Sequence, residues 1–276
     1  MIEAVKVFFL ALVQGIGEFL PISSSGHLLV LGKMLFGENG LDEGDFLTLG
    51  ILLHAGTLLS ILIVFRRDII KMLCSDWRLI GLLITASIPT AIIGFTIEKY
   101  CKSLVENLTV TGFGFLATAA LLLFVMRPKG NVTNNDHNEN TEGKSLAALT
   151  FTDALIIGLF QGIAVLPGFS RSGFTIASAI WCGAKRRDAA VFSFLLVIPA
   201  IGGVALLETV NLIQEPGSTL DSRMALWLMA AVFSCLVGIV SLVWLLKWLQ
   251  AGTLHRFAWW LIPLGVAVLI VQIFYK

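Results

Sequence analysis

The chain has 276 residues, of which 57% are hydrophobic and only 13% are charged, with a formal net charge of +1. A soluble domain carries about twice that share of charged residues, so the composition excludes a soluble protein and indicates an integral membrane protein. No basic stripe suggests a nucleic-acid partner, and we expect none. The four cysteines are scattered without a Cys-x-x-Cys pair, which argues against a metal-thiolate site or a disulfide framework.

Six apolar runs are long enough to cross a bilayer as helices, because a span needs about 20 mainly apolar residues. In chain order they are residues 46–65, 78–97, 104–126, 188–207, 224–247 and 255–275. Two further runs, 4–35 and 152–184, are too long and too interrupted by polar residues for a single span. We predict that each is a re-entrant helical hairpin, which enters the membrane, turns at depth and leaves on the same side.

A polar stretch at residues 127–150 is rich in Asn and Gly and predicts a flexible linker. It separates residues 1–126 from residues 151–276, and each of these units holds one hairpin followed by three spans. Because three is an odd number of crossings, the second unit is inserted upside down relative to the first. The predicted fold is therefore an all-α polytopic membrane protein with six transmembrane helices and two re-entrant hairpins, arranged as an inverted repeat.

Most of the 19 Lys and Arg residues fall on the linker side of this topology. The positive-inside rule makes that side the cytoplasm, so we expect both termini and the mouth of the first hairpin to face outward. Trp244, Trp248, Trp259 and Trp260 flank a turn on the cytoplasmic side, and we interpret them as interfacial anchors.

The two hairpins carry related polar sequences, in which Gln14 and Gln161 stand as far apart as Gly26 and Gly173. The first reads Gln14-Gly-Ile-Gly-Glu-Phe-Leu-Pro-Ile-Ser-Ser-Ser-Gly-His27, and the second reads Gln161-Gly-Ile-Ala-Val-Leu-Pro-Gly-Phe-Ser-Arg-Ser-Gly-Phe-Thr175. Polar groups at membrane depth are costly and usually functional. We therefore expect the chemistry in these two segments.

The residue types in the two segments are those that phosphate chemistry needs. In the first hairpin they are Gln14, Glu18, Ser23, Ser24, Ser25, Gly26 and His27. In the second they are Gly168, Ser170, Arg171, Ser172, Gly173 and Thr175. A hydroxyl or a water can attack, His or Glu can move the proton, and Arg with helix N-terminal N–H groups can stabilise charge on phosphorus. Glu18, together with Gln14 one helical turn earlier, could also hold a divalent cation through oxygen ligands.

At this point the sequence resembles a known family. The pattern Gln14-x-x-x-Glu-Phe-Leu-Pro-x-Ser-Ser-x-Gly-His27, followed by Pro167-Gly-x-Ser-Arg-Ser-x-x-Thr175, is similar to the undecaprenyl-pyrophosphate phosphatases, the bacitracin-resistance membrane phosphatases. The resemblance spans essentially the whole chain. It implies hydrolysis of undecaprenyl pyrophosphate to undecaprenyl phosphate and inorganic phosphate in the bacterial cytoplasmic (inner) membrane. That activity would recycle the carrier lipid for cell-wall synthesis and confer bacitracin resistance.

The resemblance also implies roles for single residues. Ser24 is the expected nucleophile, His27 its acid/base partner and Arg171 the phosphate clamp, with Mg²⁺ or Ca²⁺ as the cofactor. Family members carry Glu or Gln at the first motif position, which is Gln14 here. A neutral amide cannot act as a base, so the carboxylate work is expected to rest on Glu18.

Two alternatives to this function follow from the same pattern. A transporter of an anionic substrate, including a lipid-phosphate flippase, would also have inverted repeats with broken helices. A pure carrier, however, has no use for Glu18, Ser24 and His27 together. The other large class of membrane lipid phosphatases is excluded, because the His that its Ser-Arg-x₅-His motif requires does not follow Arg171. His54 can equally bond a helix carbonyl or serve the site, and the oligomeric state, a homodimer included, stays open.

Overall fold

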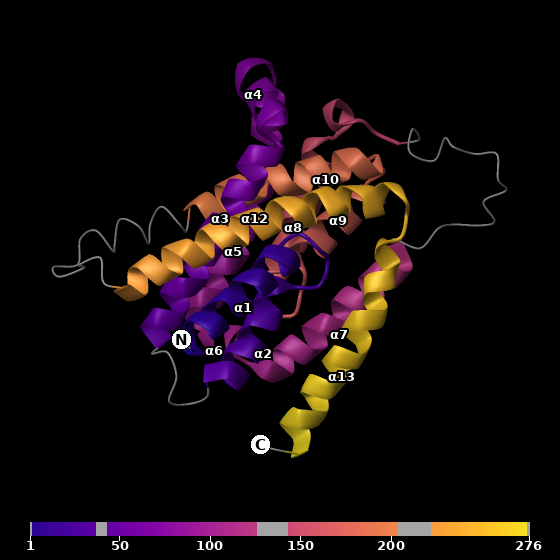
Figure 1. The fold of residues 1–276 in the computed structure, drawn as a ribbon. Coiled ribbons are helices and arrows are strands. Elements are labelled where there is room, and N and C mark those ends of the chain that lie inside the picture. The colour runs from indigo at the N-terminus through magenta and orange to yellow at the C-terminus, as the bar shows by residue number, and fades with distance from the viewer. Residues whose placement is uncertain (1, 37–42, 126–142, 204–221, 275–276) are drawn as a thin grey trace.

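The computed structural model describes residues 2–36, 43–125, 143–203 and 222–274, and every regular element in this part of the chain is a helix (Figure 1). The helices are α1 (Ile2–Gly17), α2 (Ser24–Phe36), α3 (Glu43–Val64), α4 (Arg66–Ser75), α5 (Trp77–Tyr100), α6 (Lys102–Val105), α7 (Leu108–Val125), η1 (Leu146–Ala148), α8 (Phe151–Ile163), α9 (Arg171–Trp181), α10 (Arg186–Leu195), α12 (Ser222–Gln250), η2 (Leu254–Phe257) and α13 (Ala258–Phe274).

Five of the described helical segments are long and apolar enough to cross a membrane. They are α3, α5, α7, α12 and α13 together with η2, and they match five of the six predicted spans. The sixth predicted span, 188–207, is interrupted in its described part, because α10 ends at Leu195 and a turn lies at Leu196. Pro199 lacks an N–H and cannot donate to the carbonyl of Leu195 four residues earlier, which accounts for the break. The end of that run lies outside the described residues, so the number of spans stays a prediction.

The two predicted hairpins are both present as pairs of packed helices, α1 with α2 and α8 with α9. Each hairpin packs against a long helix from the other half of the chain: α1 lies on α12, whereas α8 lies on α5. The remaining large contacts join α3 to α12 and α7 to α13, and the second pair runs side by side in Figure 1. This exchange is what an inverted repeat requires, although the inverted orientation and the re-entry into a membrane stay predictions.

Buried aromatic side chains support the turn between the two helices of the first hairpin. Phe19, two residues beyond the end of α1, is fully buried and packs edge-on against Phe194 of α10 at 5.7 Å between ring centroids. Phe194 in turn stacks on Phe65, between α3 and α4, at 5.9 Å. The turn that carries the predicted chemistry therefore packs against α10, which belongs to the second half of the chain.

The end of the predicted linker is fixed to the mouth of the second hairpin. The N–H of Lys144 donates to the carbonyl of Gly183 over 2.7 Å, and the N–H of Lys185 donates to the carbonyl of Lys144 over 3.0 Å. The Lys144 ammonium lies 2.9 Å from the carboxylate of Asp153, which forms a capping box with Thr150 at the start of α8. Residues 143–150 are therefore fixed to the second hairpin rather than flexible, and the rest of the linker predicted for 127–150 lies outside the described residues.

Candidate functional site

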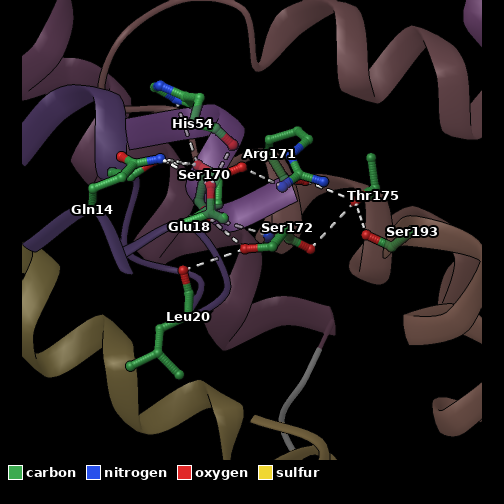
Figure 2. Close-up of polar contacts among 12 residues, drawn as sticks. Gln14, Glu18, Leu20, His54, Ser170, Arg171, Ser172, Thr175 and Ser193 are labelled. Carbon is green, nitrogen blue, oxygen red and sulfur yellow. Dashed lines mark hydrogen bonds and ion pairs between the residues drawn. The ribbon is translucent and has the colours of Figure 1, made fainter. Parts of the chain in front are cut away.

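The carboxylate of Glu18 is the centre of a buried polar cluster (Figure 2). Its Oε1 lies 2.6 Å from Nη2 of Arg171, an ion pair that joins the two hairpins. Its Oε2 accepts hydrogen bonds from Ser24 Oγ over 2.8 Å and from Gln14 Nε2 over 3.0 Å. Nε2 of His54 lies 3.6 Å from the same oxygen. Gln14 and Arg171 approach Glu18 from opposite sides in Figure 2, and only 6% of Glu18 is exposed.

The turn that presents Ser24 to Glu18 has an unusual backbone. Glu18 continues the last turn of α1, and after it the chain reaches Ser23, whose φ of 66° is the one positive value at a non-glycine residue in the described chain. Such a conformation is strained for an L-residue and is typically retained at functional sites. Ser23 Oγ accepts the N–H of Gly26 over 3.3 Å, which starts α2 with Ser24 as its first residue. Ser25 is exposed and contacts only the hydroxyl of Ser23, at 3.4 Å, among the printed side-chain contacts of the described residues.

His27 lies in the outer layer of this cluster, and neither of its ring nitrogens is bonded to Glu18 or Ser24. Its Nδ1–H donates to the carbonyl of Ser23 over 2.8 Å, while its Nε2 accepts the indole N–H of Trp260 over 3.1 Å. A carbonyl can only accept, so Nδ1 carries the proton. Trp260, which the sequence predicts to be an anchor, therefore also orients His27.

His54 of α3 bonds a carbonyl of its own helix, as one of the two sequence interpretations expects, and it also lies beside Glu18, while its service to the site stays a prediction. Its Nδ1–H donates to the carbonyl of Gly50 over 2.7 Å, which turns Nε2 toward Glu18. The His54 side chain is 30% exposed, against 5% for that of Glu18. One turn further along α3, Thr57 Oγ1 lies 3.5 Å from Gln14 Nε2, so α3 contributes two polar groups to the cluster.

Arg171 is the first residue of α9, and the second hairpin holds it firmly. Ser170 caps the helix by accepting the N–H of Gly173 over 3.2 Å. Thr175 donates its hydroxyl proton to the carbonyl of Arg171 over 2.8 Å and also contacts the hydroxyl of Ser193. Nη1 of Arg171 is buried and has no hydrogen-bond partner among the described residues. A buried donor without a partner is unusual, and this one is available to accept an anionic group as a partner.

Several residues that the sequence predicts to bind substrate also hold the hairpin tips together. Ser172 Oγ donates to the carbonyl of Leu20 over 3.3 Å, from one hairpin to the other. A Cβ on Gly26 would lie 2.8 Å from the nitrogen of Gly168, and a Cβ on Gly173 would lie 3.3 Å from the proline of the first hairpin. The small residues at these positions therefore permit the close approach that brings Arg171 to Glu18.

The surroundings of Glu18 bear on the predicted cation site. Among the described residues there is no group of three or more His, Cys, Asp or Glu side chains that could hold a metal ion. Both oxygens of Glu18 already have donors, and the Arg171 cation occupies the position next to Oε1. Oε1 of Gln14 is buried without a partner, but a single amide oxygen is a weak ligand on its own. The cation predicted from the sequence, with Glu18 and Gln14 as ligands, stays untested.

Comparisons with known proteins agree on one family. The sequence model of the family described as bacitracin resistance protein BacA matches residues 7–267. An undecaprenyl-diphosphatase of Rhodopirellula baltica is 40% identical, over 99% of this chain and 100% of the relative. Proteins of the same name from Carboxydothermus hydrogenoformans and Methanosphaera stadtmanae are 35% and 32% identical; the matches cover 97% and 99% of this chain and the same shares of the relatives.

Proposed function

Because the chain belongs to the bacitracin resistance protein BacA family, we propose that it is a membrane phosphatase that hydrolyses undecaprenyl diphosphate to undecaprenyl phosphate and inorganic phosphate. The names of the relatives support the substrate, and the five long apolar helices support an enzyme that meets a lipid within the bilayer. The single observation that carries the proposal is that one buried carboxylate, Glu18, contacts both a serine hydroxyl and a guanidinium.

The first step is an attack on the terminal phosphorus by the hydroxyl of Ser24 or by a water in its place. As the new P–O bond forms, the proton of the attacking group passes to Oε2 of Glu18, which Ser24 already contacts at 2.8 Å. The bond between the terminal phosphorus and the bridging oxygen breaks, and undecaprenyl phosphate leaves with the electron pair. If Ser24 attacks, water then cleaves the phosphoserine and releases inorganic phosphate.

Arg171 supplies the positive charge that this step needs. Its free Nη1 can donate to a phosphoryl oxygen while Nη2 stays near Glu18, and the first N–H groups of α9 add the dipole of a helix N-terminus. Fixed donors of this kind stabilise charge on the phosphoryl group as it transfers. Because the guanidinium is planar and permanently charged, lysine would be a poor replacement.

We further propose that the proton leaves Glu18 through His54 rather than through His27. Nε2 of His54 faces Oε2 of Glu18, and the imidazole is the most exposed of the side chains that surround this carboxylate, as far as their exposure is described. Both nitrogens of His27 already have partners, and we assign to His27 the orientation of the turn that carries Ser24. The acid/base role that the family resemblance implies for His27 is thus replaced in this proposal by a positioning role.

The cellular proposal follows from the topology predicted by the sequence. We place the enzyme in the bacterial cytoplasmic membrane with both termini outside and with the site open to the outer face. There it would recycle the carrier lipid for cell-wall synthesis, and it would confer bacitracin resistance. The apolar surfaces of the long helices leave room for the prenyl tail in the bilayer.

Phosphate release from isoprenyl diphosphates by the purified protein in detergent tests the proposal directly, because transport cannot occur there. We expect release by the wild type, none above background by Ser24→Ala, and wild-type release by Ser241→Ala. Ser241 is a matched control, since it is also buried but donates only to a carbonyl of its own helix.

Each outcome has one meaning. A wild-type protein that binds the lipid diphosphate but releases no phosphate would contradict the phosphatase and favour an anionic-lipid carrier. A Ser24→Ala variant that keeps the full rate would contradict the phosphoserine and leave direct attack by water.

A further inference from the structure

One hydroxyl outside both hairpin motifs holds the tip of the second hairpin. Thr118 lies near the middle of α7 and is fully buried. Its Oγ1 donates to the carbonyl of Gly168 over 3.1 Å and accepts the N–H of Ser170 over 3.0 Å. The one proton and one lone pair of the hydroxyl are thereby both in use.

These two bonds act on the residues that determine where Arg171 lies. Gly168 has a φ of 88°, so the chain turns sharply there, and Ser170 is the N-cap of α9. Only one residue separates the two backbone groups that Thr118 contacts, and Arg171 follows immediately. The hydroxyl therefore fixes both the turn and the start of the helix that carries the guanidinium to Glu18.

α7 as a whole is shaped to receive the hairpin tips. Gly114, Phe115 and Thr118 are spaced so that they lie on one face of the helix. A Cβ on Gly114 would lie 2.6 Å from the carbonyl oxygen of Pro167, so the second tip touches the backbone of α7. The ring of Phe115 packs edge-on against His27 of the first hairpin, at 5.1 Å between centroids. Thr118 is the polar side chain on this face that contacts the tip holding Arg171.

Removing this hydroxyl would leave two buried backbone groups without partners, the carbonyl of Gly168 and the N–H of Ser170. Buried backbone groups in native structures are almost always paired, so the turn would shift to find other partners. Such a shift would change the position of Arg171 relative to Glu18, to which it is bonded at 2.6 Å.

We propose that Thr118 is a positioning residue, whose hydroxyl holds the Gly168–Ser170 turn so that Arg171 meets the terminal phosphate of the substrate. This inference rests on the proposed function, because it takes Arg171 as the phosphate clamp. Thr118 itself touches neither substrate nor reacting atoms. Its effect is expected on kcat rather than on KM, since the lipid tail supplies binding and Arg171 stabilises the charge of the transferring group.

The test compares phosphate release by the purified Thr118→Val, Thr118→Ser and Thr111→Val variants. Thr111 is a matched control on the same face of α7, because it is also fully buried but donates only to the carbonyl of Asn107 in its own helix segment. We expect Thr118→Val to lower kcat on the order of 10²-fold, as for a misplacement of about 1 Å at a reacting centre. Thr118→Ser should regain most of that loss, and Thr111→Val should match the wild type.

Equal kcat values for Thr118→Val and Thr111→Val would overturn the proposal, as would a loss in Thr118→Val that appears in KM alone or that Thr118→Ser does not restore. If Thr118→Val does not fold, Thr118→Ala decides in its place, because it removes the hydroxyl without adding bulk. The wild-type rate separates this test from the proposed function: an inactive wild type contradicts the function, whereas an active wild type with an unaffected Thr118→Ala contradicts only the role of Thr118.

Discussion

The two histidines near the site have opposite environments, although only His27 lies within a hairpin motif. His27 donates to Ser23 and accepts from Trp260, so its ring is fixed on both sides. His54 is fixed on one side by Gly50 and presents its other nitrogen to Glu18. Position in a motif therefore predicts that a histidine belongs to the site, but its hydrogen-bond partners indicate which histidine can move a proton.

The pH dependence of kcat should distinguish these two histidines. His54→Gln is expected to lower kcat by roughly 10²-fold, the usual contribution of a general acid or base, and to remove the limb of the pH–rate profile that reports an imidazole. His27→Gln should lower kcat at every pH without changing the shape of the profile, because it acts through the turn of Ser24. Loss of that limb in His27→Gln, and its retention in His54→Gln, would return the acid/base role to His27.

The ion pair of Glu18 with Arg171 leads to a prediction about metal ions. Both carboxylate oxygens have donors, and the Arg171 cation already adjoins Oε1. The substrate-free protein should therefore show no specific binding of Mg²⁺ or Ca²⁺. Calorimetric titration of the wild type and of Ser241→Ala should give no saturable heat. Stoichiometric binding that disappears in Glu18→Gln would contradict this reading and support a resident cation.

At the scale of elements, the hairpins were predictable and their support was not. A proline, glycines and hydroxyls inside an apolar run indicate a broken helix, and this pattern located Gln14, Glu18, Ser24 and Arg171. The contribution of α7 could not be predicted in the same way. Thr118 sits in an unremarkable apolar run, and its partners lie in another half of the chain. Which face of one helix meets which turn is decided by tertiary packing rather than by local pattern.

The close contact between α7 and the second hairpin can be tested with a single methyl group. Gly114→Ala should lower the stability of the detergent-solubilised protein by about 1–3 kcal/mol, the usual cost of overpacking, because the new Cβ would meet the backbone of the second tip. Gly44→Ala in α3 is the control, since no atom lies within 4 Å of the corresponding Cβ. Equal unfolding temperatures for the two variants would show that the tip can move away from α7 without cost.

For the whole molecule, composition and hydropathy were sufficient to predict a helical membrane protein, and five of the six predicted spans are confirmed as long apolar helices. In the sixth predicted span an internal proline, which can either bend a helix or end it, lies close to the interruption after Leu195. The end of the linker was misjudged. Lys144 is polar and lies in a polar stretch, but its partner Asp153 is fixed by the cap of α8, and only the folded chain brings the two together.

The predicted orientation can be measured with cysteine labelling. Cys74 of α4 is exposed and is predicted to face the cytoplasm, whereas the exposed Ser103 of α6 is predicted to face outward. In a background without the other cysteines, Cys74 should react with a membrane-impermeant maleimide only after the cells are permeabilised. Ser103→Cys, in a background without any native cysteine, should react in intact cells. The reverse pattern would invert the proposed topology and move the site to the inner face.

The ion pair at the centre of the site also bears on how the enzyme meets free phosphate. The carboxylate of Glu18 already pairs with the guanidinium that a phosphate would bind. A carboxylate of the protein itself, fixed to the first hairpin, thus lies where the anion of the substrate would interact with Arg171. Inorganic phosphate bound at Nη1 would lie beside this carboxylate, whose negative charge weakens its binding and favours its release after each turnover. An enzyme surrounded by its own product would remain available to the next lipid.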